Sequence, residues 1–359
     1  MQKNDSVSEK KVLVGISGGV DSAVTLALLK NANYAVEAVF LRLADTSQKA
    51  KESLQDAKKI CQLLAVPLHI KDARAVFEKT VIKYFLAEYA KGNTPNPCVF
   101  CNEQIKFKLL LEIAKKLEFD FVATGHYARI KKVTDGVEIK YKLVAAKDEK
   151  KDQSYFLYRL KQEQLAKIIF PLGDYQKDDV RELAKKFNLP VFNKLDSQDV
   201  CFMQNNKLEE FLRKKIKLIR GKIVDTKNKI IGEHKGLALY TIGQRKGIEI
   251  GGSGPYFVVA KNLKKNQLIV TNNPAHPALS LKKINLKKLS WTNACPRLPL
   301  AVLVRTRYHN FLESAIIKTD KAKKTYWLEL RKPQKAVAPG QSAVFYTKNG
   351  EILGGGIIK

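Results

Sequence analysis

Over the first third of the chain, apolar and polar positions alternate between two patterns, one typical of buried strands and one typical of helices. Apolar runs at 11–16 (KVLVGI) and 34–43 (YAVEAVFLRL), bounded by polar residues, predict buried strands. Between them, 22–30 (SAVTLALLK) predicts a short buried helix, and from 50 to 64 apolar residues recur at helical spacing. Strands that alternate with helices predict βαβ units, whose parallel sheet is covered by helices on both faces.

The alternation continues to residue 127. PLHIKDA (67–73) and FDFVATGHY (119–127) predict two further strands. The segment 74–92 predicts a helix closed by a glycine, and 103–117 predicts another. Asn102 would cap this last helix, which would place the preceding cysteine at a helix N-terminus.

After about residue 205 the pattern changes to a basic helix, a strand pair around Lys227-Asn228 and a glycine-rich basic stretch. From about Pro277 only short strands are predicted, and Asn349-Gly350 predicts a hairpin between the last two. We therefore expect an α/β catalytic domain with a parallel sheet, a small basic middle domain and a C-terminal antiparallel β-barrel. Their expected bounds are 1–205, 206–276 and 277–359.

The charge of the chain points to a polyanionic partner. Lys and Arg number 65 against 35 Asp and Glu, so the net charge is +30. This excess favours nucleic acid over a membrane, because no run of about 18 apolar residues is present to span a bilayer. The polar N-terminus lacks the apolar core of a secretory signal, and five cysteines do not suggest a secreted disulfide framework. We therefore expect a soluble, cytoplasmic protein.

The segment 15–22 (GISGGVDS) has the features of a phosphate-binding loop between the first strand and the first helix. Gly18 and Gly19 would let the backbone approach a ligand, and the helix N-terminus would point its N–H groups at an anion. Ser17 and Ser22 add hydroxyl donors, and Asp21 could position a magnesium ion, a ribose or a phosphate. SGGVDS resembles the signature of the ATP pyrophosphatase (PP-loop) superfamily, whose members cleave ATP between the α- and β-phosphates.

The five cysteines fall into two groups. Cys61 lies on the buried face of a predicted helix, and Cys295 is expected to be structural in the barrel. Cys98 and Cys101 form a C-x-x-C pair, with Cys201 a hundred residues later. One such pair lacks the four ligands of a structural zinc site. The three could hold an iron–sulfur cluster, or Cys101 and Cys201 could act as nucleophile and sulfur carrier.

The motifs together resemble the bacterial tRNA-specific 2-thiouridylases (MnmA/TrmU family), whose catalytic domain has the PP-loop (adenine nucleotide alpha hydrolase-like) fold. They run in order over nearly the whole chain: SGGVDS, TPNPCVFCNEQIKF, ATGHYAR, KDQSYFLYRL, FPLGDYQKDDVRELA, DSQDVCFM, GEHKGLALYTIGQRKG and PGQSAVFY…LGGGII.

The resemblance implies an ATP-dependent transferase that replaces the C2 oxygen of a tRNA wobble uridine with sulfur. ATP and magnesium (Mg2+) are the implied cofactors. Implied partners are tRNAs for Lys, Glu and Gln and a sulfur donor such as a cysteine desulfurase or a sulfur-relay protein. The implied ATP contacts are Gly15, Ile16, Ser17, Gly18, Gly19, Val20, Asp21, Ser22, Leu41 and Gly125.

By the same resemblance, Cys201 carries a persulfide, and Cys101 releases the product through a transient Cys101–Cys201 disulfide. The implied tRNA contacts are Asn96, Pro97, Cys98, His126, Lys151, Asp152, Gln153, Arg307, Tyr308 and Gln341. Taken alone, His126 could equally be a satisfied core histidine, and Arg307-Tyr308 an ordinary strand pair.

One position departs from the family pattern. Many members have an aspartate where this chain has Cys98, and that carboxylate is proposed as the acid or base near the uridine. Either Cys98 performs proton transfer poorly, another group performs it, or Cys98, Cys101 and Cys201 bind an iron–sulfur (4Fe–4S) cluster. Two other functions fit parts of the sequence: a PP-loop amidating synthetase, which the charge and the paired thiols disfavour, and a non-catalytic RNA-binding protein, which the intact SGGVDS disfavours.

Overall fold

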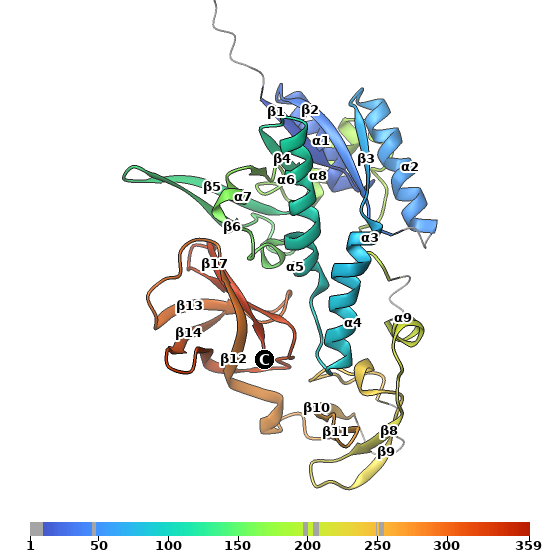
Figure 1. The fold of residues 1–359 in the computed structure, drawn as a ribbon, viewed down its shortest axis with the longest axis vertical. Coiled ribbons are helices and arrows are strands. Elements are labelled where there is room, and N and C mark those ends of the chain that lie inside the picture. The colour runs from blue at the N-terminus through green and yellow to red at the C-terminus, as the bar shows by residue number, and fades with distance from the viewer. Residues whose placement is uncertain (1–9, 45–47, 197–199, 204–207, 249, 251–254) are drawn as a thin grey trace, which may run out of the picture. The chain divides into compact units, whose positions relative to one another are not determined.

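The protein is described from a computed structural model, which describes residues 10–44, 48–196, 200–203, 208–248, 250 and 255–359. The chain forms two compact units (Figure 1). Unit 1 comprises Met1–Lys79, Val99–Phe202 and Gly350–Ile352, and unit 2 comprises Thr80–Cys98, Met203–Asn349 and Leu353–Lys359.

Unit 1 is built on a parallel sheet with strand order β3-β2-β1-β4-β7. The chain runs outward from β1 through β2 to β3 and then returns to the other side of β1 with β4. The strand order thus reverses beside β1, where open α/β sheets bind ligands at the carboxyl ends of their strands. The strands are β1 (Lys11–Gly15), β2 (Ala35–Arg42), β3 (Leu68–Asp72), β4 (Phe121–Thr124) and β7 (Ile168–Ile169).

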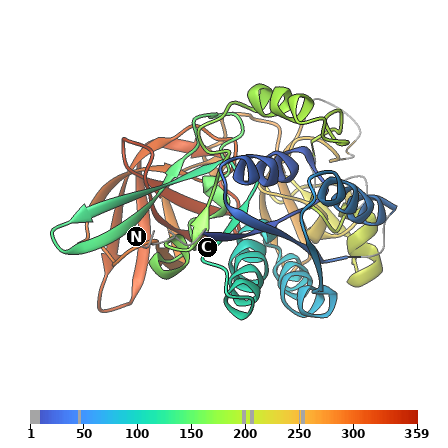
Figure 2. The ribbon, with the colours of Figure 1, turned by 90° about the horizontal axis from the view of Figure 1, so that it is seen from above.

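Helices cover both faces of this sheet (Figure 2). On one face, α1 (Val20–Asn31), α2 (Gln48–Leu63) and α8 (Lys177–Lys186) pack with alternate residues of β1 into a single hydrophobic core. α6 (Phe107–Lys116) covers the opposite face, where Leu110 packs against the carboxyl end of β1. Because it is enclosed, α1 is apolar and buried along most of its length, as its sequence predicts.

The helix predicted at 103–117 begins earlier than expected. A helical turn, α5 (Pro97–Cys101), is followed by a π-helical turn at Asn102–Lys106 and then by α6. The predicted cap at Asn102 is wrong: its side-chain amide donates to the Phe156 carbonyl at 3.2 Å. Pro97 opens the helix instead, since a proline is tolerated where the N–H has no helical partner.

Unit 1 also contains elements that the sequence pattern did not predict. A hairpin of β5 (Ala128–Asp135) and β6 (Glu138–Ala145) follows β4 directly. The segment predicted as one helix, 74–92, is divided into three helical stretches. These are Arg74–Phe77, a π-helical turn at Glu78–Ile82 and α4 (Lys83–Ala90), and α4 belongs to unit 2. The short helices Ser154–Phe156 and α7 (Gln162–Leu165) complete the described helices of unit 1.

Unit 2 holds a mixed four-stranded sheet, of order β10-β11-β8-β9, and a closed six-stranded antiparallel barrel, of order β12-β15-β14-β13-β16-β17. The predicted barrel is confirmed, although β12 was not foreseen. The elements are α9 (Leu208–Lys215), β8 (Gly221–Val224), β9 (Ile230–His234), β10 (Phe257–Asn262), β11 (Gln267–Thr271), β12 (Ser280–Trp291), β13 (Leu300–Arg305), β14 (Glu313–Asp320), β15 (Thr325–Lys335), β16 (Ser342–Tyr346) and β17 (Ile352–Ile358), with short helices at Leu237–Leu239 and Pro277–Leu279. Within the described part of the chain, no helix has the length and apolarity needed to cross a membrane.

Candidate functional site

The predicted phosphate loop joins β1 to α1 and is shaped by its own serines. The Ser22 hydroxyl donates to the Gly19 carbonyl at 3.1 Å and accepts from the Ser17 backbone N–H at 3.1 Å. Gly18 has φ +71°, and a Cβ there would lie 2.1 Å from the Ser53 carbonyl oxygen, so only glycine fits. Among the described residues no side chain caps α1, which leaves its first turn directed at the loop.

Two predicted ATP contacts lie at the carboxyl ends of β2 and β4, the two strands that flank β1. Leu41 is the penultimate residue of β2, and Gly125 follows β4 directly. A Cβ at Gly125 would come within 2.8 Å of backbone atoms of Asp21 and Ser22. The absence of a side chain therefore lets the end of β4 pack directly on the first turn of α1.

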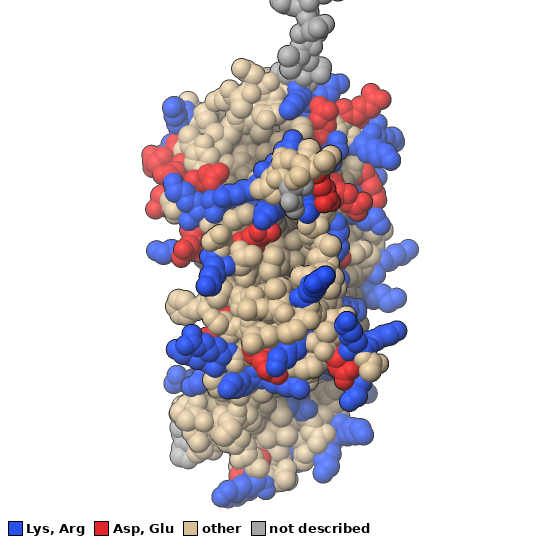
Figure 3. Space-filling model, turned by 90° about the vertical axis from the view of Figure 1, so that its left-hand side faces the viewer, with Lys and Arg blue, Asp and Glu red and all other residues tan. Residues whose placement is uncertain are grey.

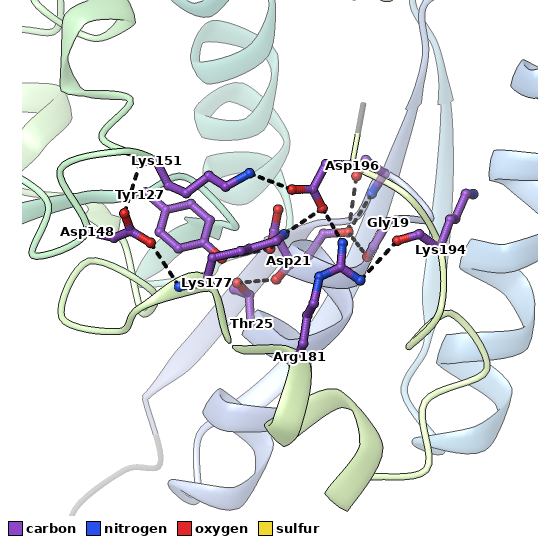
Figure 4. A network of polar contacts seen from close by, with 12 residues as sticks. Gly19, Asp21, Thr25, Tyr127, Asp148, Lys151, Lys177, Arg181, Lys194 and Asp196 are labelled. Carbon is purple, nitrogen blue, oxygen red and sulfur yellow. Dashed lines mark hydrogen bonds and ion pairs between the residues drawn. The ribbon is translucent and has the colours of Figure 1, made fainter. Parts of the chain in front are cut away.

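Asp21 of the phosphate loop is held by two other segments of unit 1. Its Oδ1 accepts from the Tyr127 hydroxyl at 2.9 Å and from Lys177 Nζ at 2.6 Å (Figure 4). Burial, followed by the Asp21 charge, raises the pKa of Tyr127, so this phenol remains a donor. The Lys177 side chain is only 8% exposed, which makes it a buried ammonium beside the phosphate loop.

A second carboxylate, Asp196, collects three cations in the same cluster (Figure 4). Its oxygens lie 2.7 Å from Lys151 Nζ, 3.0 Å from Lys177 Nζ and 2.8 Å from Arg181 Nη2. Burial acts to raise the pKa of Asp196, but hydrogen bonds from Lys151 and Lys177 outweigh it and lower the pKa. Asp196 is therefore an anion held by three donors, and the sequence alone does not show that these residues come together.

Two further contacts fix this cluster on the loop. The Asp148 carboxylate accepts from the backbone N–H of Lys177 at 2.9 Å, which orients the start of α8. Lys194 Nζ donates to the Gly18 carbonyl at 2.9 Å and lies 2.6 Å from the Asp56 carboxylate. Helix α8 and the segment after it thus bring Lys177, Arg181 and Lys194 to the phosphate loop and its cluster, and the segment after β6 brings Lys151.

All five cysteines are free thiols. Cys61 is buried in the core beside α1, as predicted, and burial raises its pKa to about 11. The expectation that Cys295 is structural is wrong, because it is exposed in the loop between β12 and β13. Cys98 is half-buried and Cys101 is buried, whereas Cys201 is exposed.

The predicted position of Cys101 at a helix N-terminus is also wrong. Cys101 is the last residue of α5 and has helical backbone angles, φ −63° and ψ −45°. Cys98 lies in the first turn instead, next to Pro97. The helix start that was expected beside Cys101 therefore lies beside Cys98.

Lys106 is a site residue that sequence reasoning missed. Its Nζ lies 3.4 Å from His126 Nε2, while His126 Nδ1 lies 2.7 Å from the Thr124 hydroxyl. An ammonium can only donate, so Nε2 accepts and the imidazole proton is on Nδ1. Burial, followed by the Lys106 charge, lowers the pKa of His126 well below its ordinary value, which keeps the ring neutral.

The same ammonium acts on Cys201. Although Cys201 is an exposed residue, the protein atoms around its thiol remove part of its hydration and raise its pKa, while the Lys106 charge acts in the opposite direction. Lys106 therefore favours the thiolate of Cys201 and the neutral form of His126 together. Lys106 ends the π-helical turn that follows Cys101, and only the structure shows this.

Among the described residues, which include Cys98, Cys101 and Cys201, no group of three or more His, Cys, Asp or Glu is arranged to hold a metal ion.

In unit 2, the loop before Cys98 is held in place by the barrel. The Thr94 N–H donates to the Pro339 carbonyl at 2.8 Å, and Gln341 Nε2 donates to the Thr94 carbonyl at 2.7 Å. The mixed sheet contributes Lys261, whose Nζ donates to the Gly92 carbonyl at 2.8 Å. Gln341, predicted to contact tRNA, is thus next to the stretch that contains the predicted contacts Asn96, Pro97 and Cys98.

The other predicted tRNA contacts are divided between the units. Lys151 belongs to the Asp196 cluster, Asp152 is buried and accepts two backbone N–H groups, and Gln153 accepts from the Tyr127 N–H. In unit 2, Arg307 and Tyr308 follow β13. Arg307 is exposed, and the Tyr308 ring packs on His309 at 4.1 Å between centroids.

The loop of Arg307 and Tyr308 contains a residue that the sequence did not single out. Phe311 is 94% exposed. A large exposed aromatic ring beside an arginine is a common feature of surfaces that stack on unpaired bases. The available signal was an apolar pair, Phe311-Leu312, directly after the polar residues His309 and Asn310.

Matches to known protein families cover almost the entire chain. Family models match in order: tRNA methyl transferase HUP domain at 10–205, tRNA methyl transferase PRC-barrel domain at 209–272 and aminomethyltransferase beta-barrel domain at 281–358. The predicted fold class is confirmed by these matches and by the sheet and barrel topology.

Relatives named tRNA-specific 2-thiouridylase MnmA are similar over nearly their whole length. The one from Neisseria meningitidis serogroup C is 43% identical over 99% of this chain and 97% of its own. Those from Hydrogenovibrio crunogenus and Vibrio cholerae are each 42% identical over 98% of this chain, and over 94% and 97% of their own. The chain therefore belongs to the MnmA family.

Proposed function

We propose that this protein is an ATP-dependent tRNA-uridine 2-sulfurtransferase, which converts the wobble uridine of certain tRNAs to 2-thiouridine with release of AMP and pyrophosphate. The observation that carries the proposal is that one α/β unit holds the phosphate loop at 15–22 together with Cys101 and Cys201, in a chain of the MnmA family.

The first step activates the base. The uridine C2 oxygen attacks the α-phosphorus of ATP, an O–P bond forms, and the bond to the β-phosphate breaks to release pyrophosphate. The C2 oxygen thereby becomes part of an adenylate leaving group. In our proposal the loop residues 15–22, with Leu41 and Gly125, bind ATP, and Mg2+ arrives with the phosphates, which are its preferred ligands.

The second step transfers sulfur. A persulfide on Cys201 attacks C2 with its terminal sulfur, and AMP leaves with the original oxygen. The Cys101 thiolate then attacks Cys201 Sγ, which frees the sulfur on C2 as 2-thiouridine and leaves a Cys101–Cys201 disulfide. An external thiol reductant restores both thiols. The exposure of Cys201 supports its loading by a separate sulfur donor, a cysteine desulfurase or a sulfur-relay protein.

Unpaired anticodon bases are the proposed tRNA target, because a base must leave its stack before it can react. We assign Asn96, Pro97 and Cys98 to the target uridine, and further contacts to His126, Lys151, Asp152, Gln153, Arg307, Tyr308 and Gln341. Basic side chains spread over the whole of the face in Figure 3 support binding to a phosphate backbone. The tRNAs for Lys, Glu and Gln are the proposed substrates.

The dithiol pathway balances without a metal, and it is the one we propose. An iron–sulfur cluster on Cys98, Cys101 and Cys201 is the alternative. Anaerobic purification with iron and sulfide analysis decides between them: full activity of metal-free protein would remove the cluster. We place the reaction in the cytoplasm, where thiols remain reduced, in keeping with five free cysteines.

The decisive experiment incubates the purified protein with unmodified tRNA, Mg2+–ATP and a persulfide donor, and analyses tRNA nucleosides by mass spectrometry. Cys101→Ser and Cys201→Ser should each abolish 2-thiouridine while tRNA-dependent adenylation survives. Cys295→Ser, which removes an exposed thiol outside the site, should retain full activity. Thiolation at the wild-type rate by either of the first two variants would refute the disulfide-release step. ATP–pyrophosphate exchange independent of tRNA would indicate an amidating synthetase instead.

A further inference from the structure

Helix α4 ends in a common type of helix stop that contains an uncommon pair of side chains. The Gly92 N–H donates to the Tyr89 carbonyl at 2.9 Å, and the Asn93 N–H donates to the Glu88 carbonyl at 3.0 Å. Because Gly92 has φ +73°, these are the two hydrogen bonds of a Schellman motif. The residues at the positions of Glu88 and Asn93 frequently make a hydrophobic contact in this motif. Here they are a carboxylate and an amide.

The Glu88 carboxylate lies where an anion is unfavourable for two reasons. Its side chain is 10% exposed, so the charge is largely removed from water. It also lies in the last turn of α4, at the negative end of the helix dipole. The nitrogens of Lys91 and Lys287, at 3.5 and 3.6 Å, are too distant for strong charge-assisted hydrogen bonds. The short contact is with Asn93, whose Nδ2 donates to Glu88 Oε2 at 2.8 Å.

Glu88 is nevertheless an anion. Burial acts to raise its pKa, but the hydrogen bond from Asn93 and the charges of Lys287 and Lys91 outweigh burial and lower the pKa. An apolar pair would end the helix equally well and would bury no charge. Because residues that break such local rules are expected at functional or strained sites, this pair needs a reason beyond the helix stop.

Asn93 begins the segment that leads to the proposed uridine contacts. A Cβ at Gly340 would lie 3.0 Å from the Asn93 Cβ, so the backbone of the barrel packs closely on this side chain. The barrel also holds Thr94 by its N–H and its carbonyl, at 2.8 and 2.7 Å. The Thr94 hydroxyl lies 3.0 Å from that of Thr241. The start of the segment is therefore fixed from several sides.

The residues after Thr94 transmit this position over a short distance. Pro95 and Pro97 are both buried and have restricted φ angles. Each proline also restricts the residue before it, Thr94 or Asn96, to extended conformations. The chain from Thr94 to Pro97 therefore has few conformations available, and the place of its start sets the place of the residues assigned to the uridine.

We propose that Glu88 is a positioning residue for 2-thiouridine formation: through Asn93 it holds the segment 93–98 where its last three residues meet the target uridine. The inference rests on the proposed function, because it requires Asn96, Pro97 and Cys98 to contact that base. Glu88 acts by orientation and touches neither tRNA nor ATP. A hydrogen bond of 2.8 Å fixes a direction, whereas an apolar contact does not.

The first test separates the reaction rate from tRNA affinity. Glu88→Leu removes the acceptor, and tRNA-dependent adenylation at saturating tRNA should become about 100-fold slower, the effect of a displacement near 1 Å. The KM for tRNA should change by less than about twofold, because contacts to phosphates elsewhere supply most of the affinity. Glu88→Gln retains an oxygen that can accept from Asn93, so it should react at a rate close to that of wild type.

A double variant distinguishes positioning from stability. Glu88→Leu combined with Asn93→Leu gives the motif its usual apolar pair, so the melting temperature should return to that of wild type or exceed it. The adenylation rate should stay low, because no directed hydrogen bond is restored. Recovery of the rate together with the melting temperature would show that the role of Glu88 is structural only.

A second measurement requires no tRNA, ATP or sulfur. Cys98 is half-buried at the far end of the segment, and iodoacetamide should alkylate it several times faster in Glu88→Leu and in the double variant. Cys61 is buried and reports general unfolding, and Cys295 is exposed and reports the reagent. Both should react as in wild type. Faster alkylation of Cys61 together with Cys98 would indicate a general loss of stability and would overturn the proposal.

Lys91→Met is the matched control, because it removes a 68% exposed ion-pair partner of the same carboxylate and keeps the hydrogen bond to Asn93. It should equal wild type in adenylation rate and in Cys98 alkylation. A wild-type adenylation rate in Glu88→Leu, or equal Cys98 alkylation in Glu88→Leu and Lys91→Met, would overturn the proposal. If Cys98 responds as expected but wild type makes no 2-thiouridine, the proposed function fails and the positioning of the segment by Glu88 stands.

Discussion

At the scale of single residues, Lys106 is the side chain whose removal should be most informative. It is the charge that favours the Cys201 thiolate, and it lies 3.4 Å from His126 Nε2. We expect Lys106→Met to raise the pKa of Cys201 and to slow its alkylation at pH 8 by roughly threefold to tenfold, since the thiolate is the reacting form. Mass spectrometry of the Cys201 peptide after timed exposure to iodoacetamide measures this rate.

Lys108→Met is the matched control for Lys106, because Lys108 is an exposed lysine two residues further along the same helical segment. It should leave the alkylation rate of Cys201 unchanged. An equal slowing in both variants would show that net charge, rather than the position of Lys106, governs the thiol.

At the scale of elements, the contact between the end of β4 and the start of α1 depends on Gly125. A methyl group there would lie 2.8 Å from backbone atoms of Asp21 and Ser22, which cannot yield as a flexible side chain would. We therefore expect Gly125→Ala to displace the first turn of α1 and to lower ATP affinity by at least about tenfold, a loss near 1.4 kcal/mol in binding. Calorimetric titration with ATP and Mg2+ measures it.

A second glycine separates this effect from a general backbone penalty. Gly136 lies in the turn between β5 and β6 with φ +63°, and among the described residues other than its two chain neighbours no heavy atom lies within 4 Å of the position of its added Cβ. Gly136→Ala should cost about 1 kcal/mol of stability, from the left-handed backbone alone, and leave ATP affinity as in wild type. ATP affinity unaltered by Gly125→Ala would refute the close-approach argument.

The anchor of the loop before Cys98 should depend on pH. Burial lowers the pKa of Lys261 to about 8, and its Nζ holds the Gly92 carbonyl. The unfolded chain retains the lysine proton to about pH 10.4. Between these values the unfolded state binds more protons, so the contribution of Lys261 to stability rises as pH rises from 8 towards 10.4.

We therefore expect the free energy of unfolding, measured in urea, to rise more for wild type than for Lys261→Met as pH increases from 7.5 to 9.5. Lys264→Met removes an exposed lysine from the adjoining turn. Its free energy of unfolding should differ from that of wild type by the same amount at every pH in this range. Parallel stability curves for wild type and Lys261→Met would contradict the assigned pKa.

Elements with one strong local signal were predictable from the sequence. The β1–α1 unit followed from an apolar run, two glycines and an apolar helix, and the turn at Gly350 followed from its hairpin pair. β12 was missed because paired lysines (SLKKINLKKLSW) interrupt its alternation, and Lys288 has a left-handed backbone where the register shifts. The start of the Cys101 helix was misplaced because Asn102 bonds to Phe156, 54 residues away.

The candidate site likewise contains parts that were predictable from the sequence and parts that were not. The loop at 15–22 and the cysteines are visible as local motifs, so the sequence located them. The Asp196 cluster is not local. The contact between Asp21 and Lys177 spans 156 residues, and in a chain of net charge +30 the sequence does not show that Lys177 becomes buried. Chemistry that depends on tertiary contact could be found only after the fold placed α8 beside α1.

At the scale of the whole molecule, the charge of +30 should make tRNA binding strongly dependent on salt, because each neutralised phosphate releases counterions. The loop after β13 contains two residues that we propose contact tRNA through different interactions. Arg307 is an exposed cation, and Phe311 is a 94% exposed ring. Arg307→Gln should weaken tRNA binding and reduce the slope of log affinity against log salt by about 1.

Phe311→Ala should weaken tRNA binding by roughly 1–3 kcal/mol, the range for loss of one stacked base, and leave the salt slope unchanged, because a stacking contact releases no counterions. Filter binding of unmodified tRNA at several salt concentrations measures both quantities on the same samples. Val137→Ala, which truncates a fully exposed apolar side chain in the β5–β6 turn, controls for general loss of exposed apolar surface and should bind as wild type. A change in slope for Phe311→Ala, or none for Arg307→Gln, would mean that this loop does not meet the RNA as assigned.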